Sequence, residues 1–264
     1  MSERGRLWEQ DLSGWAIPAE ILEAAPESPW GFPVELFIRA AEQASPPTPS
    51  RARALEALPH GGSVLDVGCG AGAASRALAP PAALITGVDE SEQMLAAFAA
   101  TAPGSHVEVL GRWPDVAARV DPADVVVCHH VLYNVPDIEP FIAALNDHAR
   151  RRVVVEIYDE HPLAWMNPLW HELHGLDRPE RPHAADAFDV ISAAHLGAQI
   201  ERWDGRAANW ESDLGDALFT FLRKRLCLPP ERDDELRAAL ARTPPPSVRR
   251  TVTIWWEAGA GSPG

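Results

Sequence analysis

The sequence predicts an α/β fold with a doubly wound, mostly parallel sheet of seven strands, the last of them antiparallel. Three observations predict it. From residue 63 onwards, short apolar runs alternate with stretches of helical spacing. Several of these runs, such as DVVVC and RVVVEI, are almost continuously apolar, which is typical of parallel strands buried on both faces. The first run ends in a glycine-rich turn that leads into a helix, as in one half of a nucleotide-binding sheet.

The expected elements can be placed in chain order. The apolar runs indicate strands at 63–67, 84–88, 106–110, 123–128, 151–156, 198–203 and 249–258. Helical spacing between them indicates helices at 72–79, 91–100 and 138–149. Further helices are expected at 161–176 and 185–197, and a helical insert between the last two strands at 213–226 and 231–241. The helices after the fifth and sixth strands are expected to cover a site at the edge of the sheet.

The first 60 residues are expected to form an amino-terminal lid and helices. Prolines at positions 18, 26, 29 and 33 interrupt long helices before residue 34, although residues 19–25 could form a short one. Apolar side chains recur at helical spacing over 34–44, and a second helix follows at 50–58 after the proline-rich run SPPTPS. We therefore expect a wrapped segment that ends in a lid.

Composition and charge exclude several classes of protein. A chain of 264 residues that is 46% hydrophobic can bury a full core, and one α/β domain with additions fits this length. The formal net charge of −15 repels nucleic-acid backbones and anionic lipid, so neither nucleic acid nor a membrane is expected as a partner. Three widely spaced cysteines predict no disulfide framework. Without a basic leader or a long apolar run, a soluble, cytoplasmic protein is expected, and its oligomeric state is left open.

The glycine-rich turn follows the first strand, where residues 64–72 read VLDVGCGAG. Gly68, Gly70 and Gly72 have no side chains to keep a ligand away from the backbone N–H groups, and the N-terminus of the next helix faces the turn. The spacing GxGxxA also matches a dinucleotide fingerprint, so the turn alone does not distinguish between nucleotide ligands.

Two acids narrow the choice of ligand. Asp66 stands two residues before the first glycine, where it can reach a cationic amine directly or through water but would oppose a pyrophosphate. Asp89 follows the second strand, where a carboxylate can accept hydrogen bonds from both hydroxyls of a ribose. Together with the glycines, these acids predict a nucleoside that carries an amino-acid tail.

These residues resemble the motifs of the class I S-adenosylmethionine (SAM)-dependent methyltransferases. VLDVGCGAG is similar to the first motif of that family, and GVDESEQML, residues 87–95, is similar to the second. The resemblance covers residues 63–158 closely and 198–258 loosely, and it implies a Rossmann-like fold with SAM as the cofactor. The positions that it implies for cofactor binding are Asp66, Gly68, Cys69, Gly70, Asp89, Glu90, Met94, Arg112, Trp113 and Cys128.

The segment after the third strand departs from the family pattern. Where the family often has an acid for the adenine amine, the chain reads LGRWPDV, so Arg112 and Trp113 are expected in that region. Trp113 could stack on the base, or it could instead cap the core as an aromatic residue of the next helix.

The fourth strand ends in CHHVLYNV, residues 128–135, which the resemblance places beside the methionine moiety and the methyl acceptor. Methyl transfer from a sulfonium chiefly requires that the acceptor is aligned and water excluded, and an acceptor that carries a proton also benefits from a base. His130 is the predicted base because imidazole can exchange a proton near neutral pH. His129 is expected to contact the cofactor. Alternatively, both rings are packing or hydrogen-bonding residues of a helix start.

The acceptor is expected to be a small molecule, with oxygen favoured over nitrogen or carbon because of the histidines. Aromatic side chains from segments expected above the carboxyl edge of the sheet could wall its pocket. The candidate substrate contacts are Trp30, Tyr133, His161 and Trp165.

No metal site is predicted. His171 and His174 lie one helical turn apart and could share a metal, but no third ligand stands at a recognisable spacing. Arg51 or Arg53 could bind the carboxylate of the cofactor, although solvated surface explains either residue.

The predicted function is SAM-dependent methyl transfer to a small molecule by a single domain, residues 1–264. Residues 1–60 would form the lid and its helices, 61–160 the cofactor-binding core, and 161–197 and 205–247 the covering helices. Two alternatives stay open: a protein that binds SAM without transferring its methyl group, and an NAD(P)-dependent oxidoreductase.

Overall fold

The computed structural model describes residues 1–31, 38, 47–194, 197–206 and 215–259. The helix expected at 34–44 lies outside this part of the chain except for Ile38. Two pieces of other expected helices, 195–196 and 213–214, also lie outside the described residues. So does Trp210.

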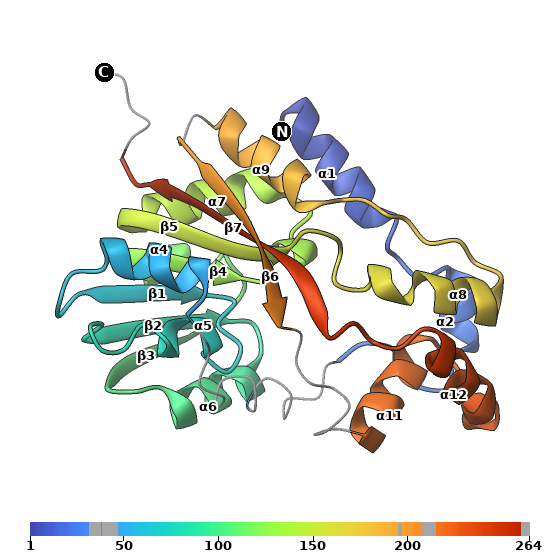
Figure 1. Cartoon of the computed structure of the whole chain (residues 1–264). Coiled ribbons are helices and arrows are strands. Elements are labelled where there is room, and N and C mark those ends of the chain that lie inside the picture. The colour runs from blue at the N-terminus through green and yellow to red at the C-terminus, as the bar shows by residue number, and fades with distance from the viewer. Residues whose placement is uncertain (32–37, 39–46, 195–196, 207–214, 260–264) are drawn as a thin grey trace.

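Seven strands form one sheet in the order β3-β2-β1-β4-β5-β7-β6 (Figure 1). Neighbouring strands run parallel except at β7, which is antiparallel to both β5 and β6. The predicted Rossmann-like sheet with an antiparallel last strand is confirmed, and each predicted strand is found within a few residues of its expected bounds. The strands are β1 Ser63–Val67, β2 Leu84–Asp89, β3 Ser105–Leu110, β4 Ala123–His129, β5 Ala149–Tyr158, β6 Gln199–Arg206 and β7 Val248–Glu257.

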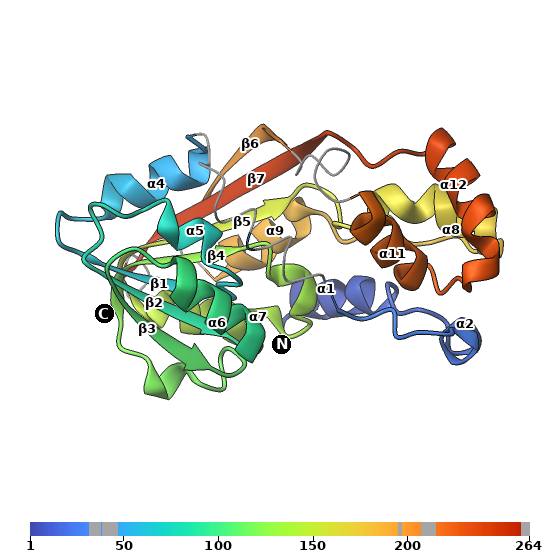
Figure 2. The same ribbon diagram turned by 90° about the horizontal axis from the view of Figure 1, so that it is seen from below.

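Helices pack on both faces of the sheet (Figures 1 and 2). Because successive residues of a strand point to opposite faces, Trp256 is buried in one core and Trp255 in the other. The core around Trp256 includes side chains of α1 (Glu3–Ser13), α7 (Ile138–Asp147) and α9 (Ala184–Ala193). The core around Trp255 includes side chains of α4 (Pro49–Ala57), α5 (Ala73–Arg76) and α6 (Glu92–Thr101).

Helix α1 is an element that the sequence prediction missed. The prolines that argue against a long helix begin only at Pro18, and Ser2 caps α1 by accepting a hydrogen bond from the Gly5 N–H (3.1 Å). Trp8 is buried on the face that α1 turns toward the sheet, and its Nε1–H donates to the Val135 carbonyl (2.8 Å). Helix α1 therefore covers a face of the sheet, whereas its segment was expected above the carboxyl edge, and Trp8 is a core residue.

A smaller group of helices lies beside the sheet (Figure 1): α2 (Ala19–Ala24), α8 (Asn167–His174), α11 (Gly215–Arg225) and α12 (Asp233–Arg242). Their apolar side chains form a separate core, which includes Leu169, Trp170, Leu222 and Leu236. We call these four helices the helical lobe. The helix expected at 161–176 is shorter than predicted because Pro168 lies in the first turn of α8, where its missing N–H costs nothing.

Short 3₁₀ turns complete the described chain at Ala117–Arg119, Leu132–Asn134, Ala164–Met166 and Pro230–Arg232. Across the described ranges, no helix combines the length and the apolar composition that a bilayer crossing requires.

Candidate active site

The glycine-rich turn connects β1 to α5 at the carboxyl edge of the sheet. Gly68, Gly70 and Gly72 have φ angles of 70°, 51° and 83°, a region that residues with a Cβ rarely adopt. The Gly68 N–H donates to the Val88 carbonyl (2.8 Å), which ties the turn to β2. A Cβ on Gly68 would lie 2.4 Å from Val131 Cγ2, so the segment after β4 packs directly on the turn.

Asp66 is a buried acid, 1% exposed, near the end of β1. Its Oδ2 accepts hydrogen bonds from Ser75 Oγ (2.6 Å) and Ser75 N–H (3.3 Å). Burial raises the pKa of Asp66 to about 6 in spite of these hydrogen bonds, and the charge of Asp89 contributes to the increase. Within the described residues, no cationic side chain is paired with Asp66 or Asp89.

Asp89 ends β2 and is held by two backbone N–H groups. Its Oδ2 accepts from Gly70 (2.9 Å) and its Oδ1 accepts from Ser91 (2.9 Å). Each carboxylate oxygen has lone-pair capacity for a further donor. Glu90 beside it is exposed, and Met94 is half-buried in the first turn of α6.

Two histidines and a glutamate meet where β4 and β5 end. His129 is the register partner of Glu156 on the neighbouring strand. His130 Nε2 lies 3.1 Å from Glu156 Oε1, and His129 Nδ1 lies 4.0 Å from Glu156 Oε2. His130 has a φ of 59°, and its N–H donates to the Glu156 carbonyl (2.6 Å). Since the next residue, Val131, packs on Gly68, the histidines lie beside the glycine turn.

Burial and hydrogen bonding determine the protonation states. Burial raises the pKa of Glu156, but the two histidines and the Ser50 hydroxyl lower it to a net value of about 2. Burial lowers the pKa of His129, so this ring is neutral at pH 7. Because ionised Glu156 can only accept, His130 Nε2 carries a proton in this contact, and the neutral tautomer with that proton has its lone pair on Nδ1. His130 Nδ1 is buried and has no hydrogen-bond partner in the described part of the chain.

Aromatic contacts connect the histidine pair to Tyr133 and His161. The His130 ring lies 4.4 Å from the Tyr158 ring, between centroids. Tyr133 Oη accepts from the Tyr158 N–H and donates to the Tyr158 carbonyl (3.3 Å), and burial raises its pKa well above the ordinary value. Its hydroxyl is therefore neutral and occupied by the main chain. The Tyr133 and His161 rings lie edge to face, with their centroids 5.7 Å apart. The His161 ring in turn stacks on the Trp15 ring, with 3.7 Å between centroids.

Comparison with known proteins identifies the family. Residues 65–154 match a family model described as a methyltransferase domain. Over 200 residues, the chain is 30% identical to a ubiquinone biosynthesis O-methyltransferase of Rhizobium rhizogenes, and the match covers 67% of this chain and 77% of that protein. The chain belongs to the class I SAM-dependent methyltransferases.

Two further methyltransferases are similar to this one. A ubiquinone biosynthesis O-methyltransferase of Idiomarina loihiensis is 32% identical over 138 residues, which are 45% of this chain and 57% of that protein. The plantazolicin methyltransferase BamL, solved with a triazolic desmethylPZN analogue and S-adenosylhomocysteine (SAH), is 14% identical with a TM-score of 0.50. That likeness covers 97% of this chain and 99% of BamL, and at this identity it shows the fold alone. As a member of the family, this methyltransferase uses SAM as its cofactor.

The residues at the turn fit SAM, which carries a sulfonium and an ammonium group. Asp66 and Asp89 are two acids without a cationic partner in the described chain, and the raised pKa of Asp66 reflects a buried carboxyl group without a counter-charge. Asp66 would bind the ammonium group and Asp89 the ribose hydroxyls. Both roles stay predictions.

The other predicted cofactor contacts differ in exposure. Cys69 and Cys128 are buried, and burial raises the pKa of both thiols, so they remain protonated. Arg112 is exposed. Trp113 is 5% exposed, and its ring contacts His148 edge to face at 4.9 Å. This placement favours the core-capping alternative for Trp113, and its part in adenine binding stays a prediction.

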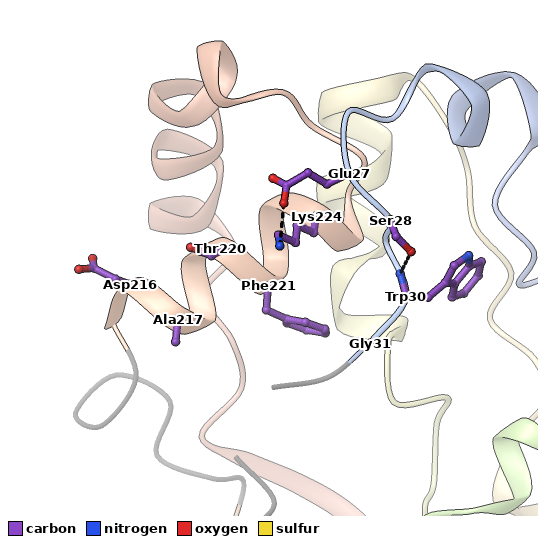
Figure 3. A pocket seen from close by; sticks show the side chains of 9 residues that line it. All are labelled: Glu27, Ser28, Trp30, Gly31, Asp216, Ala217, Thr220, Phe221 and Lys224. Carbon is purple, nitrogen blue, oxygen red and sulfur yellow. Dashed lines mark hydrogen bonds and ion pairs between the residues drawn. The ribbon is translucent and has the colours of Figure 1, made fainter. Parts of the chain in front are cut away.

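Trp165 and Trp30 line two different hollows. Trp165 is half-buried and lines a hollow of about 270 Å³ together with Tyr158 and Arg249. Trp30, which is 56% exposed, lines a hollow of about 630 Å³ between residues 27–31 and α11 (Figure 3). The structure therefore connects Trp165 to the histidine pair through Tyr158, and it places Trp30 against the helical lobe.

Glu156 is the functional candidate that sequence reasoning missed. An acid directly follows the apolar run VVV, residues 153–155, of the fifth strand, and the carboxyl ends of adjacent parallel strands meet at one edge of a sheet. These two signals together could have placed Glu156 beside the histidines. Ser50, also missed, shares a hydrogen bond of 2.6 Å with Thr253 and faces the same carboxylate.

The remaining candidate residues have other partners. His171 Nδ1 lies 2.8 Å from Asp177 Oδ1, whereas His174 Nε2 lies 2.7 Å from the Leu226 carbonyl, so the two rings do not face one point. Arg53 is paired with two glutamates of the surface, and the Nε of Arg51 is buried without a partner in the described chain.

Proposed function

We propose that this methyltransferase transfers the methyl group of SAM to a hydroxyl group of a small molecule, with His130 as the general base. The observation that carries the proposal is the contact between His130 Nε2 and Glu156 Oε1 (3.1 Å) beside the glycine turn. A carboxylate that accepts from one ring nitrogen selects the tautomer and orients the lone pair of the other nitrogen. The similar proteins of Rhizobium rhizogenes and Idiomarina loihiensis carry the name O-methyltransferase, which supports oxygen as the acceptor atom.

When bound, SAM supplies a methyl group that its sulfonium already activates. The residues of the chain have three further tasks. Asp66 and Asp89 bind and orient the cofactor at the turn. His130 Nδ1 accepts the proton of the hydroxyl group, and ionised Glu156 stabilises the resulting imidazolium. A buried nitrogen without a hydrogen-bond partner is costly, so a hydroxyl group that donates to Nδ1 gains free energy on binding.

The proposal includes a small-molecule acceptor and a cytoplasmic enzyme without nucleic-acid or membrane partners. The net charge of −15 supports this part, because such a field repels polyanions and anionic lipid. We also propose that residues 1–264 act as one catalytic domain.

The test is the variant His130→Gln, assayed for SAH formation with a panel of phenols and catechols. Loss of a general base should lower turnover by about 10²-fold to 10⁴-fold while SAM binding persists. The control His171→Gln replaces a histidine whose side chain is 69% exposed, and it should leave turnover unchanged. Unchanged turnover in His130→Gln would remove the base from the proposal. SAM binding without SAH formation from any acceptor would support the alternative that the protein does not transfer methyl groups.

A further inference from the structure

Two arginines approach the buried side chain of His161 from different segments. Arg178 Cζ lies 5.7 Å from the centroid of the Trp15 ring, and that ring stacks on His161 at 3.7 Å. Arg249, on β7, donates from Nη2 to the carbonyl of Pro162, the residue after His161 (2.6 Å). Both guanidinium groups are therefore held in place around the same histidine.

Arg225, from α11, is the third member of what we call the arginine cluster: Arg178, Arg225 and Arg249. Its Cζ lies 4.8 Å from the centroid of the Trp30 ring. Burial and then the charges of Arg225, Arg178 and Arg249 lower the pKa of His161 to about 3. The neutral His161 ring therefore lies in a positive field that three separate segments of the chain create.

The arginine cluster has no carboxylate partner among the described residues. By contrast, Arg223 and Lys224 of the same helix both reach Glu27, at 3.0 and 2.7 Å (Figure 3 draws the lysine pair). Carboxylates are abundant, with 38 acids against 23 lysines and arginines. A half-buried guanidinium without a counter-charge is costly, and burial lowers the pKa of both Arg178 and Arg225. An anion that binds there would offset this cost.

The arginine cluster adjoins the proposed base. The Tyr158 ring has His130 at 4.4 Å, between centroids, and Arg249 Cζ at 4.1 Å. Tyr133, whose hydroxyl is bound to the Tyr158 main chain, contacts His161 with its ring edge. The Tyr158 ring therefore lies between His130, which would take the proton, and the guanidinium of Arg249.

We propose that the arginine cluster binds a carboxylate of the methyl acceptor, so that the substrate is a hydroxy acid methylated on its hydroxyl group. This inference rests on the proposed function, since it names the class of acceptor for the same site. Arg178 and Arg249 donate to main-chain carbonyls, whereas Arg225 has no acceptor for its guanidinium in the described chain. Within that part of the chain, the planar fork of donors of Arg225 is therefore open to a bidentate carboxylate, and Arg225 is the contact residue to test.

The experiment compares two probes that differ only in charge, 4-hydroxybenzoate and 4-hydroxybenzamide, by titration calorimetry in the presence of SAH. The wild-type protein should bind the carboxylate at least about tenfold more tightly than the amide, because hydrogen bonds to charged groups are the stronger ones. Arg225→Met should reduce this preference to less than about twofold, and Arg225→Lys should restore part of it. The control is Arg237→Met, because Arg237 also lies over an aromatic ring, Phe219 at 4.5 Å, but pairs with Asp234.

Equal binding of the two probes by wild type, or a preference that survives in Arg225→Met, would overturn the inference. The inference would also be overturned if neither probe bound to the wild-type protein. Thermal unfolding of each variant excludes misfolding as the cause of a lost preference, and Arg225→Lys provides a second reading if the methionine variant fails to fold. SAH formation is measured separately. Methyl transfer to neutral phenols, without a preference for acceptors that carry a carboxylate, contradicts this inference alone. Binding of the carboxylate probe without methyl transfer to any acceptor contradicts the proposed function and leaves the anion site supported.

Discussion

Replacing Asp66 by asparagine tests how the glycine turn recognises its cofactor. The pKa of Asp66 is about 6 in the folded protein, so its ionised fraction falls from about nine tenths at pH 7 to about one tenth at pH 5. Only the ionised form attracts the ammonium group of SAM. The affinity for SAM should therefore weaken about tenfold between pH 7 and pH 5 on account of this residue.

The variant Asp66→Asn should lose this contribution to the pH dependence. At pH 7 it should bind SAM about tenfold to a hundredfold more weakly, because a hydrogen bond to a charged group contributes about 1.5–3 kcal/mol. Calorimetric titrations with SAM at pH 5, 6 and 7 measure both effects. The control is Asp124→Asn, since Asp124 near the start of β4 accepts from the Ser63 N–H (2.9 Å) at the opposite edge of the sheet. An identical pH slope in wild type and Asp66→Asn would refute the assignment of Asp66 to the ammonium group.

The same substitution should stabilise the protein without its cofactor. Folding raises the pKa of Asp66 from the ordinary 3.8 to about 6, so the folded state binds the proton more tightly than the unfolded chain does. Ionised Asp66 therefore lowers the free energy of unfolding increasingly as the pH rises from about 4 to 6, and above pH 6 this loss reaches about 3 kcal/mol. A neutral amide at this position does not cause the loss. Urea unfolding at pH 7 should show a more stable variant. Greater stability together with weaker SAM binding cannot come from misfolding.

Three further substitutions probe the site and its support. Gly68→Ala should destabilise the fold by about 1–3 kcal/mol, because its Cβ would overlap Val131 and its φ is positive; urea unfolding measures this, and Gly68→Ala with Val131→Ala should recover part of the loss. Glu156→Gln should lower turnover and remove a contribution to folding stability that is complete above pH 4.5 and lost toward pH 2. Equal midpoints of acid unfolding in this variant and in the wild type would contradict this. Trp8→Phe should cost about 1–3 kcal/mol in thermal unfolding, since it leaves the buried Val135 carbonyl without its donor.

The sheet and the turn are predictable from sequence because their signals are local. The apolar runs of the central strands β1, β4 and β5 become buried strands, and the acids Asp66 and Asp89 stand at fixed distances from the glycines. Helix α1 shows where local reasoning fails. Its sequence is polar around Trp8, and the helix is stabilised by the packing of that ring against distant parts of the chain. The spacing of apolar residues within the segment does not indicate such packing.

The catalytic candidates were predictable only in part, because their partners are distant in sequence. The pair His129 and His130 stands out in the chain, but Glu156 becomes their partner only through the pairing of β4 with β5. Tyr133 is a plausible acceptor contact by sequence, yet its hydroxyl is occupied by the main chain of Tyr158. Side-chain roles of this kind depend on hydrogen bonds between elements, which the sequence pattern does not encode.

The position of β7 bears on when the enzyme can become active during its synthesis. β7 lies between β5 and β6 but is translated after both, so β6 has no strand to pair with in the described sheet until residues 248–257 have emerged. Thr253 of β7 is the register partner of Glu156 and shares a hydrogen bond with Ser50, whose hydroxyl faces the same carboxylate. A nascent chain that stops before β7 lacks the strand that pairs with β5 at Glu156 and the Thr253 hydroxyl that binds Ser50. The surroundings of Glu156 are therefore complete only after residues 248–257 have joined the sheet.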